Sequence, residues 1–524
     1  MAGNGKNAIL IWHNLEIMKH SLARPVLGLL LVGLLSQLSA GQTRLREPAI
    51  PGDHPDPTVI RTGHTYWASS TSGGWAPAFP LFRSDGTADD WRQIGSIFPT
   101  PPAWAKGDFW APELVVDRGH ILLYYAARNG AGILCVAVAT AATPQGPYSD
   151  HGPLVCQPDG SIDPSFIRDR QGKPFLIWKE DGNSRGQATP IWAQPLSADG
   201  LRLEGQPTEI LRNDAPWEAG LVEAPYILRH HGWFYLFYAA NFCCGAACHY
   251  AEGVARARSP LGPWEKDPAN PIIHDGNGWR CPGHGTVVES SGLPVRTWLL
   301  LHAYSDQGGV YVARETVLAP IEWQNGWPLV AGNSLPQANQ VPPPFHDSFS
   351  QALDPGWQWP ISRQPDIHTG DGDLRLATTL TAPTAVLARV IDSPVYTAQI
   401  VLKAAPSDAI GFAGLGVVGN AGWTIAVGWQ QDRVVLWEQT AESGKVLAQS
   451  ASGAVLPVEL RVEASRPEQP AFSWREPGGE WRSLQSSLGT HSLLGWDSGL
   501  RLGVAVSGAA QASAVFQDYR QSSH

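Results

Sequence analysis

The sequence predicts an all-β protein in which a five-bladed β-propeller is followed by a C-terminal β-sandwich of roughly jelly-roll type. Three observations predict this fold class. A polar turn followed by an apolar strand occurs five times between residues 56 and 288. Short apolar runs separated by Gly, Asp and Ser turns continue from residue 345 to the C-terminus. No long amphipathic helix pattern occurs in the chain.

The repeated motif places one polar residue at the start of each predicted innermost strand. These residues stand at positions 56, 113, 163, 223 and 284, so successive intervals are 57, 50, 60 and 61 residues. Innermost strands surround the propeller axis, and residues far apart in sequence would therefore converge on one site. The five copies of the motif are Asp56-Pro-Thr-Val-Ile, Ala-Pro-Glu113-Leu-Val, Asp163-Pro-Ser-Phe-Ile, Glu223-Ala-Pro-Tyr-Ile and Gly-His284-Gly-Thr-Val.

Each copy of the motif is followed by two further predicted strands. A turn containing Gly separates the first strand from a second one rich in aromatic and β-branched residues. The second strands are predicted at 65–70, 121–125, 174–178, 233–238 and 297–301. The third strands are predicted at 81–84, 136–139, 191–193, 253–256 and 310–314.

The repeat stops near residue 331, which sets the predicted domain boundaries. Residues 331–344 are rich in Asn, Gln and Pro and end in Val-Pro-Pro-Pro, a composition typical of a semi-rigid linker. The predicted organisation is an N-terminal extension with a signal peptide over 1–41, the propeller over 42–330, the linker over 331–344 and the sandwich over 345–524.

The N-terminal segment has the order of a secretory signal. Lys19, His20 and Arg24 precede an apolar run over 26–38, which is followed by the small residues Ser-Ala-Gly at 39–41. The run is too short for a typical membrane span. We expect cleavage near residues 40–41 and a secreted or periplasmic protein that keeps no stable membrane insertion afterwards. The alternative is a buried N-terminal helix.

All six cysteines fall within the predicted propeller, at positions 135, 156, 243, 244, 248 and 281. In an exported protein such residues are expected to form disulfides, but their pairing is left open by the sequence. The cluster Cys243-Cys244-Gly-Ala-Ala-Cys248-His249 is also compatible with a metal site. It has no second pair of ligands at zinc-finger spacing, which favours a structural disulfide over zinc.

Composition narrows the class of partner. The formal net charge is −10 and no long basic run occurs, which argues against nucleic acid as a partner. The chain has 23 Trp residues. Indole faces stack on sugar rings, although most Trp side chains pack in cores.

Five motifs in order resemble glycoside hydrolase family 43 over about residues 50–330. They are His54-Pro-Asp56-Pro, Trp110-Ala-Pro-Glu113, Ser161-Ile-Asp163-Pro-Ser-Phe, Val222-Glu223-Ala-Pro and Gly283-His284-Gly285. Each motif is weak by itself, and the ordered set at blade spacing is specific. The resemblance implies a five-bladed propeller that inverts the anomeric centre while cutting arabinose- and xylose-containing plant polysaccharides.

The resemblance implies a role for each of three carboxylates. Asp56 matches the general base, which activates water on the face opposite the leaving group. Glu223 matches the general acid, and its apolar neighbours predict a setting that favours its protonated form. Asp163 matches a third carboxylate that orients the acid and helps to keep it protonated. The structural alternatives are turn residues for both Asp-Pro pairs and a salt-bridged Glu223.

The same resemblance implies substrate contacts. His284 matches a histidine near the propeller axis, where it would hold a structural calcium ion through water; a core histidine is the alternative. Its flanking glycines predict a close backbone approach. Arg314 matches an arginine that reaches the sugar, or it packs within the repeat. Trp110 resembles an aromatic wall of the pocket, or it belongs to a core.

Three further side chains are assigned less directly. Glu113 occupies the position in blade two that corresponds to the catalytic residues, and we interpret it as an orienting or structural carboxylate. Trp75 and Phe242 follow second strands and are predicted at the rim of the pocket.

These expectations define an exported inverting glycosidase acting on α-L-arabinofuranosyl or β-D-xylosyl linkages of hemicellulose or arabinan. No redox or nucleotide cofactor is implied. An endo- or exo-1,5-α-L-arabinanase is the nearest alternative, and a non-catalytic carbohydrate-binding propeller is another. The C-terminal domain either binds polysaccharide or completes the catalytic pocket.

Overall fold

The computed structural model describes residues 47–524 apart from 291–294, 340, 407–410, 441–442 and 486–487. The predicted signal peptide lies outside the described residues. Within the described part of the chain, no helix is long and apolar enough to cross a membrane.

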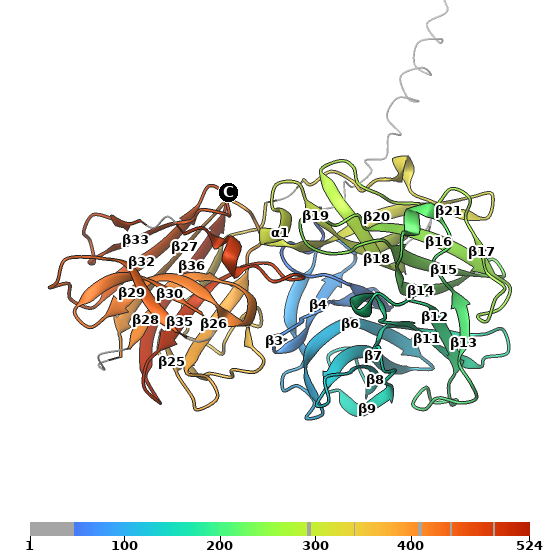
Figure 1. The fold of residues 1–524 in the computed structure, drawn as a ribbon, viewed down its shortest axis with the longest axis horizontal. Coiled ribbons are helices and arrows are strands. Elements are labelled where there is room, and N and C mark those ends of the chain that lie inside the picture. The colour runs from blue at the N-terminus through green and yellow to red at the C-terminus, as the bar shows by residue number, and fades with distance from the viewer. Residues whose placement is uncertain (1–46, 291–294, 340, 407–410, 441–442, 486–487) are drawn as a thin grey trace, which may run out of the picture. The chain divides into compact units, whose positions relative to one another are not determined.

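The first part of the chain forms five antiparallel sheets of four strands each, which confirms the predicted propeller (Figure 1). Blade one contains β1 (Thr58–Thr62), β2 (Thr65–Ser69), β4 (Ala78–Asp85) and β5 (Arg92–Phe98). Blade two contains β6 (Ala105–Asp117), β7 (His120–Asn129), β8 (Leu134–Ala141) and β9 (Ser149–Val155). Blade three contains β10 (Ser161–Arg168), β11 (Pro174–Glu180), β12 (Ile191–Pro195) and β13 (Thr208–Leu211). Blade four contains β14 (Val222–His230), β15 (Trp233–Ala240), β16 (Ala251–Ala257) and β17 (Glu265–Lys266). Blade five contains β18 (Trp279–Glu289), β19 (Thr297–Ser305), β20 (Arg314–Gln324) and β21 (Trp327–Leu329).

The first strands of the five blades close a ring. Strand β1 contacts β6 and β18, and the sequence β6, β10, β14, β18 completes the cycle of neighbours. The chain preceding β1 also pairs with the last blade, where Ile50 forms a bridge to Thr316 of β20. This pairing joins the two ends of the propeller. The predicted innermost strands therefore surround the axis, as the repeat requires.

One predicted strand is wrong. The sequence places the third strand of blade five at 310–314, but residues Gly309–Val312 form the short helix α1. The strand that pairs with β19 is β20, which begins at Arg314. Alternating Val and Tyr in this segment are equally compatible with a helical turn, and tertiary packing decides between them.

A β-bulge interrupts the first strand in four of the blades. The register shifts between Trp110 and Glu113, between Ile162 and Ser165, between Glu223 and Tyr226, and on both sides of Gly283. A residue with positive φ lies at each irregularity, and Asp56 has the same conformation just before β1. These five residues are Asp56, Ala111, Asp163, Ala224 and His284. Bulges re-aim side chains and are common beside active sites.

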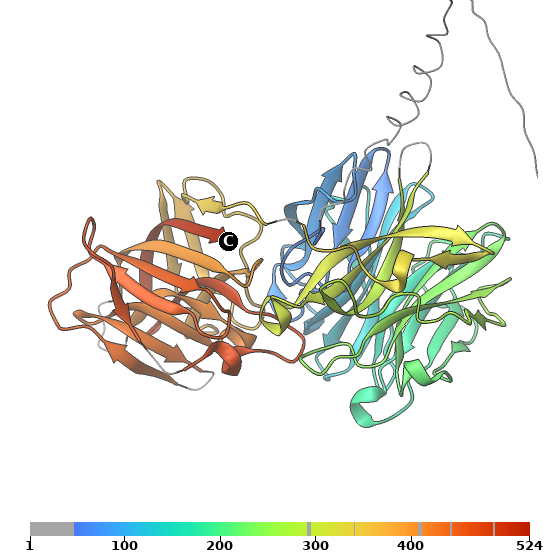
Figure 2. The same cartoon turned by 90° about the horizontal axis from the view of Figure 1, so that it is seen from above.

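The C-terminal part of the chain forms a sandwich of two antiparallel sheets, shown from above in Figure 2. One sheet has the strand order β24 (Asp366–Gly370), β25 (Asp373–Ala377), β36 (Ser513–Ser523), β27 (Tyr396–Ala404), β32 (Val458–Ala464), β33 (Ala471–Arg475) and β34 (Arg482–Leu484), with β22 (Phe345–Asp347) also paired to β36. The other has the order β26 (Thr384–Val390), β35 (Arg501–Ser507), β28 (Phe412–Val418), β29 (Thr424–Gln430), β30 (Arg433–Gln439) and β31 (Gly444–Gln449).

The apolar core of this sandwich follows from alternation along its strands. In β27, Tyr396, Ala398, Ile400 and Leu402 are buried, while the residues between them are partly exposed. Strand β32 repeats this pattern. Successive side chains of a strand point to opposite faces, so one face of each strand enters the core.

The sandwich and the propeller are joined by strand pairing and by a buried ion pair. Strand β23 (Trp359–Pro360) pairs with β3 (Trp75–Ala76) of blade one. Arg501 of β35 lies 3.5 Å from Asp53, and both side chains are almost completely buried. The guanidinium also lies 4.1 Å from the centre of the Trp75 ring. Strand pairing, an ion pair and a ring contact therefore connect the two domains.

All six cysteines form disulfides, which confirms the prediction of disulfides over zinc. The pairs are Cys135–Cys156, Cys243–Cys244 and Cys248–Cys281. No described cysteine is free.

Candidate active site

One pocket of about 390 Å³ collects all six side chains that the sequence predicts for the site. The predicted site residues that line it are Asp56, Trp110, Asp163, Glu223, His284 and Arg314. They come from all five blades. Five of them lie on or just before the first strands that form the ring, and Arg314 begins β20, the third strand of blade five.

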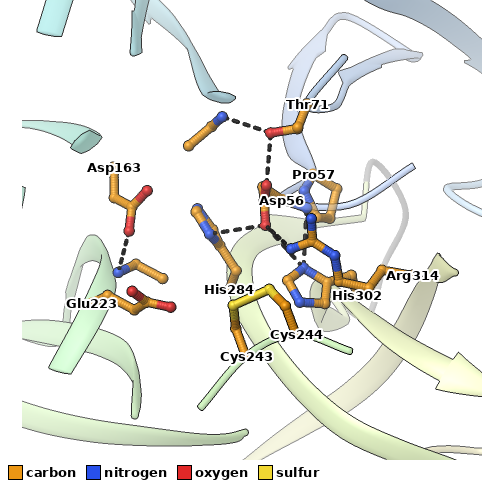
Figure 3. Close-up of polar contacts among 12 residues, drawn as sticks. Asp56, Pro57, Thr71, Asp163, Glu223, Cys243, Cys244, His284, His302 and Arg314 are labelled. Atoms are coloured by element: carbon orange, nitrogen blue, oxygen red, sulfur yellow. Dashed lines mark hydrogen bonds and ion pairs between the residues drawn. A yellow bond between two sulfur atoms is a disulfide. The ribbon is translucent and has the colours of Figure 1, made fainter. Parts of the chain in front are cut away.

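Asp56 is held by hydrogen bonds to both of its carboxylate oxygens (Figure 3). Thr71 donates its hydroxyl to Oδ2 at 2.6 Å, and Arg314 donates Nη1 to Oδ1 at 3.2 Å. Ala111 in turn donates its backbone N–H to the Thr71 hydroxyl at 2.7 Å, which fixes the direction of the Thr71 proton. Burial alone would raise the pKa of Asp56, but the charges of Arg314 and His284 outweigh it and hold this pKa well below its usual value. Asp56 is therefore ionised throughout the neutral range.

Two histidines contact Asp56 and differ in charge. His284 Nδ1 lies 3.3 Å from Oδ1 of Asp56. Burial alone would lower the pKa of His284, but the charge of Asp56, with Asp163 and Glu223, raises it to about 9. His302 Nδ1 accepts the backbone N–H of Asp56 at 3.1 Å, and burial lowers the pKa of His302 to about 4. His284 is thus an imidazolium at neutral pH, and His302 is a neutral acceptor.

The glycines that flank His284 allow the close approach that the sequence predicts. A Cβ atom on Gly283 would lie 2.4 Å from the ring of Tyr250, and one on Gly285 would lie 2.7 Å from Leu299. Either contact would displace the strand that carries His284.

Asp163 and Glu223 lie on neighbouring blades and are connected through the backbone. Asp163 accepts the N–H of Ala224 at 2.9 Å, directly beside Glu223. Burial, reinforced by the charge of Glu223 and opposed by that of His284, raises the pKa of Asp163 to about 6. Figure 3 shows both carboxyl groups on the side of His284 away from Asp56.

Lys179 is a residue of the site that sequence reasoning missed. Its ammonium lies 2.7 Å from Oε2 of Glu223 and also donates to Asp181 and Asn183, each at 2.9 Å. The side chain is buried, and the surrounding carboxylates raise its pKa although burial alone would lower it. Glu223 thus has a charged partner as well as its apolar neighbours, and this ion pair is the contact that the salt-bridged alternative for Glu223 names. A lysine within the aromatic strand Phe-Leu-Ile-Trp-Lys was the available signal.

The sandwich also contributes to the pocket. Trp496 and Asp497, from the segment after the 3-10 helix η5 (Thr490–Leu493), both line it. The ring of Trp496 meets that of Trp110 edge to face, with centroids 5.9 Å apart. The backbone carbonyl of Asp497 accepts Nη2 of Arg314 at 3.0 Å. No motif in the sequence predicted these contacts, because they depend on domain packing.

Three other predictions have different outcomes. Phe242 lines the pocket and is about half exposed, as predicted. Trp75 does not line it; its ring is buried against Val386 and Ala388 of the sandwich. Glu113 does not occupy an equivalent position, because it lies two residues after Ala111, which has the positive φ in blade two, whereas Glu223 directly precedes Ala224, which has it in blade four. Glu113 accepts the Thr58 hydroxyl at 3.2 Å, and burial raises its pKa to about 8, which supports a structural role.

The calcium ion predicted at the axis stays a prediction. Within the described ranges, no group of three or more His, Cys, Asp or Glu side chains could hold a metal ion. These side chains therefore do not fit a directly ligated ion.

Comparison with known proteins decides the family. The family profile described as glycosyl hydrolases family 43 matches residues 45–328, which is more than half of the chain. This chain belongs to glycosyl hydrolases family 43. Residues 346–520 of this family 43 protein match a second profile, the beta xylosidase C-terminal Concanavalin A-like domain.

Several family 43 relatives resemble this protein at low identity. A xylosidase/arabinosidase of Butyrivibrio fibrisolvens is 28% identical over 302 residues, covering 54% of this chain and 56% of the relative. The non-reducing end alpha-L-arabinofuranosidase BoGH43B of Bacteroides ovatus is 27% identical over 384 residues, covering 66% and 68%. The aligned part thus spans little more than half to two thirds of these relatives.

Solved family 43 structures share the fold of both domains. A xylan beta-1,4-xylosidase from Bacillus halodurans C-125 superposes with a TM-score of 0.79 at 22% identity, covering 91% of this chain and all of that one. The BlXynB protein from Bacillus licheniformis gives a TM-score of 0.78 at 22% identity, covering 92% and 100%.

Proposed function

We propose that this protein is an exported inverting glycosidase that releases α-L-arabinofuranosyl or β-D-xylosyl units from hemicellulose or arabinan fragments. The observation that carries the proposal is the meeting of Asp56, Asp163 and Glu223, from three different blades, in one pocket. Relatives named as xylosidases and arabinofuranosidases support the sugar class. The export signal rests on the N-terminal sequence alone.

In this proposal Asp56 is the general base. It is ionised at neutral pH, and three groups, Thr71, His284 and Arg314, fix its orientation. A water beside Asp56 would lose a proton to the carboxylate while its oxygen attacks the anomeric carbon. The bond to the leaving oxygen breaks on the opposite face, and the anomeric configuration inverts.

Glu223 is the general acid of the proposed reaction. It gives its proton to the leaving oxygen, which departs as a neutral hydroxyl group. The carboxylate that results is met by the ammonium of Lys179 at 2.7 Å. Asp163 positions the acid through its hydrogen bond to the N–H of Ala224.

The pocket supports removal of terminal units over cleavage within a chain. Its volume of about 390 Å³ is at the small end of ligand pockets, and loops of both domains contribute to its walls. Trp496 and Phe242 are the exposed aromatic side chains among the lining residues. A site that encloses one sugar unit suits an exo-acting enzyme.

The decisive experiment is hydrolysis of an aryl α-L-arabinofuranoside, an aryl β-D-xyloside and linear arabinan by the mature protein, with Glu223→Ala as the control. Release of the aglycone that disappears in the variant is expected and identifies the sugar. Proton NMR of the first-formed sugar should give the inverted anomer. Cleavage of arabinan alone would favour an arabinanase, and sugar binding without turnover on any substrate would favour the binding-protein alternative.

A further inference from the structure

The adjacent residues Cys243 and Cys244 form a disulfide in the loop that follows β15, and both line the pocket that holds Asp56 and Glu223. Figure 3 shows the bond near His284, which lines the same pocket. Cys244 is buried and Cys243 is partly exposed. The proposed reaction assigns no part to this disulfide.

This disulfide cannot stabilise the fold in the usual way. A cross-link stabilises chiefly by restricting the unfolded chain, and the effect grows with the length of the loop that it closes. Cys243 and Cys244 are adjacent in the sequence, so the bond between them encloses no further residues. The other two disulfides span 21 and 33 residues.

Other contacts already hold the loop. The bond between Cys248 and Cys281 ties it to β18, close to His284. The N–H of Gly245 donates to the Tyr304 hydroxyl at 3.0 Å, and Arg280 donates to the carbonyl of Ala246 at 3.0 Å. The Cys243–Cys244 bond therefore acts locally, on the surface that it presents.

That surface differs chemically from the charged part of the site and resembles the apolar lining that Ile162, Leu221 and Trp496 provide. The carboxylates, Lys179, His284 and Arg314 give the pocket strong donors and acceptors. A disulfide presents two polarisable sulfur atoms with little capacity for hydrogen bonds. A sugar ring carries hydroxyl groups at its edge and C–H groups on its faces, and the C–H groups gain dispersion energy from such a surface.

We infer that the Cys243–Cys244 disulfide is an apolar wall of the sugar-binding pocket and contacts a C–H face of the glycosyl unit. The covalent bond holds both sulfurs in one orientation, whereas two free thiols would rotate independently. A surface that is ordered before the ligand arrives loses less entropy on binding. The inference rests on the proposed function, because it takes a pentosyl unit as the ligand.

The test is direct sugar binding, which needs no turnover. Binding of D-xylose and L-arabinose is measured by the fluorescence change of the Trp residues in the wild type and in Cys243→Ala/Cys244→Ala. The matched control is Cys135→Ala/Cys156→Ala, which also lacks one disulfide but in blade two. We expect Kd to rise about tenfold in the first variant, equivalent to about 1.4 kcal/mol, and to stay unchanged in the control. Equal affinities in all three proteins would overturn the inference.

A second measurement uses the wild-type chain and does not depend on a variant that folds. After mild reduction, Cys243 and Cys244 are alkylated with and without saturating sugar, and the sites are quantified by mass spectrometry. Bound sugar should slow alkylation at these two residues and leave Cys135 and Cys156 unaffected. Equal rates, or a wild type that binds neither sugar, would overturn the inference. Sugar binding with disulfide protection but no hydrolysis would contradict the proposed function alone.

Discussion

Lys179 and Glu223 form a buried ion pair across two neighbouring blades, with Nζ 2.7 Å from Oε2. Lys179 belongs to β11 and Glu223 to β14. The ammonium is further held by Asp181 and Asn183. A charge left unpaired in such a setting is costly, so in the proposed reaction the pair would stabilise the carboxylate that Glu223 becomes after giving up its proton.

Replacing Lys179 by Met should slow the reaction most where the leaving group is poor. We expect kcat on xylobiose or arabinobiose to fall about 10- to 100-fold, within the range attributed to general acid catalysis. An aryl glycoside with an acidic phenol should lose much less, because its leaving group needs little protonation. The matched control is Lys173→Met, at an exposed lysine, which should leave kcat on both kinds of substrate unchanged. Equal losses on both substrates would show that Lys179 is only structural.

Glu223→Gln should have a stronger effect of the same kind. The amide has no proton to give, so hydrolysis of the unactivated disaccharide should fall about 10²- to 10⁴-fold. Steady-state rates with aryl glycosides of graded phenol acidity measure the effect, and the loss should shrink as the phenol becomes more acidic. A rate that is independent of the phenol in both proteins would contradict the role of Glu223.

The hydroxyl of Thr71 links Asp56, the proposed general base, to blade two. Thr71→Val removes the 2.6 Å hydrogen bond to Asp56 and leaves the N–H of Ala111 without its acceptor. A hydrogen bond to a charged group is worth about 1.5–3 kcal/mol, so kcat/KM should fall about 10- to 100-fold. The control is Thr65→Val, because the Thr65 hydroxyl donates a hydrogen bond to the exposed Asp85; this variant should leave kcat/KM unchanged. Unchanged kcat/KM in Thr71→Val would remove Thr71 from the site.

The free energy of unfolding should fall as the pH rises from 6.5 to 9. Burial raises the pKa of Glu113, Glu252 and Glu315 to about 8, and His284 has a pKa of about 9. The folded protein therefore binds more protons than the unfolded chain in this window, and raising the pH favours unfolding. Thermal melts at pH 6.5, 7.5 and 8.5 should give decreasing Tm values. A constant or rising Tm would contradict these shifts.

A single substitution isolates one contribution to this slope. Glu252 is completely buried, and burial raises its pKa to about 8 although the charge of His284 and the nearby backbone N–H groups of His284 and Gly285 act to lower it. Glu252→Gln cannot ionise, so its Tm should fall less steeply between pH 6.5 and 8.5 than that of the wild type. Glu204→Gln, at an exposed position, should leave the slope unchanged. Identical slopes in all three proteins would show that Glu252 titrates normally.

Deletion of residues 345–524 should abolish activity and solubility together. The deletion exposes Trp75, which packs on Val386 and Ala388, and leaves buried Asp53 without Arg501. It also removes Trp496 from the pocket. Expression of the deletion, followed by size-exclusion chromatography and the aryl glycoside assay, checks this outcome. A monomeric and fully active propeller would instead make the sandwich a separate module.

The fold could be predicted because it depends on local and repeated features. Strand, Gly turn and aromatic strand recur in each blade, and these patterns report burial on a pleated surface. The prediction of the third strand of blade five was wrong because residues 310–312 carry no local signal that distinguishes one helical turn from a strand. The prediction that Glu113 occupies an equivalent position was wrong because a β-bulge shifts the register between Trp110 and Glu113, and a sequence repeat does not reveal such a shift.

The sequence by itself determined the five blades and the sandwich, and the repeat spacing placed Asp56, Asp163, Glu223 and His284 at the propeller axis, whereas Trp110 and Arg314 were assigned from the family resemblance. Only the tertiary structure decided which charges and walls surround these side chains. Lys179, Trp496 and the Cys243–Cys244 bond reach the pocket from a second strand, another domain and a loop. Contacts between such segments depend on packing over long sequence distances, which no local pattern encodes.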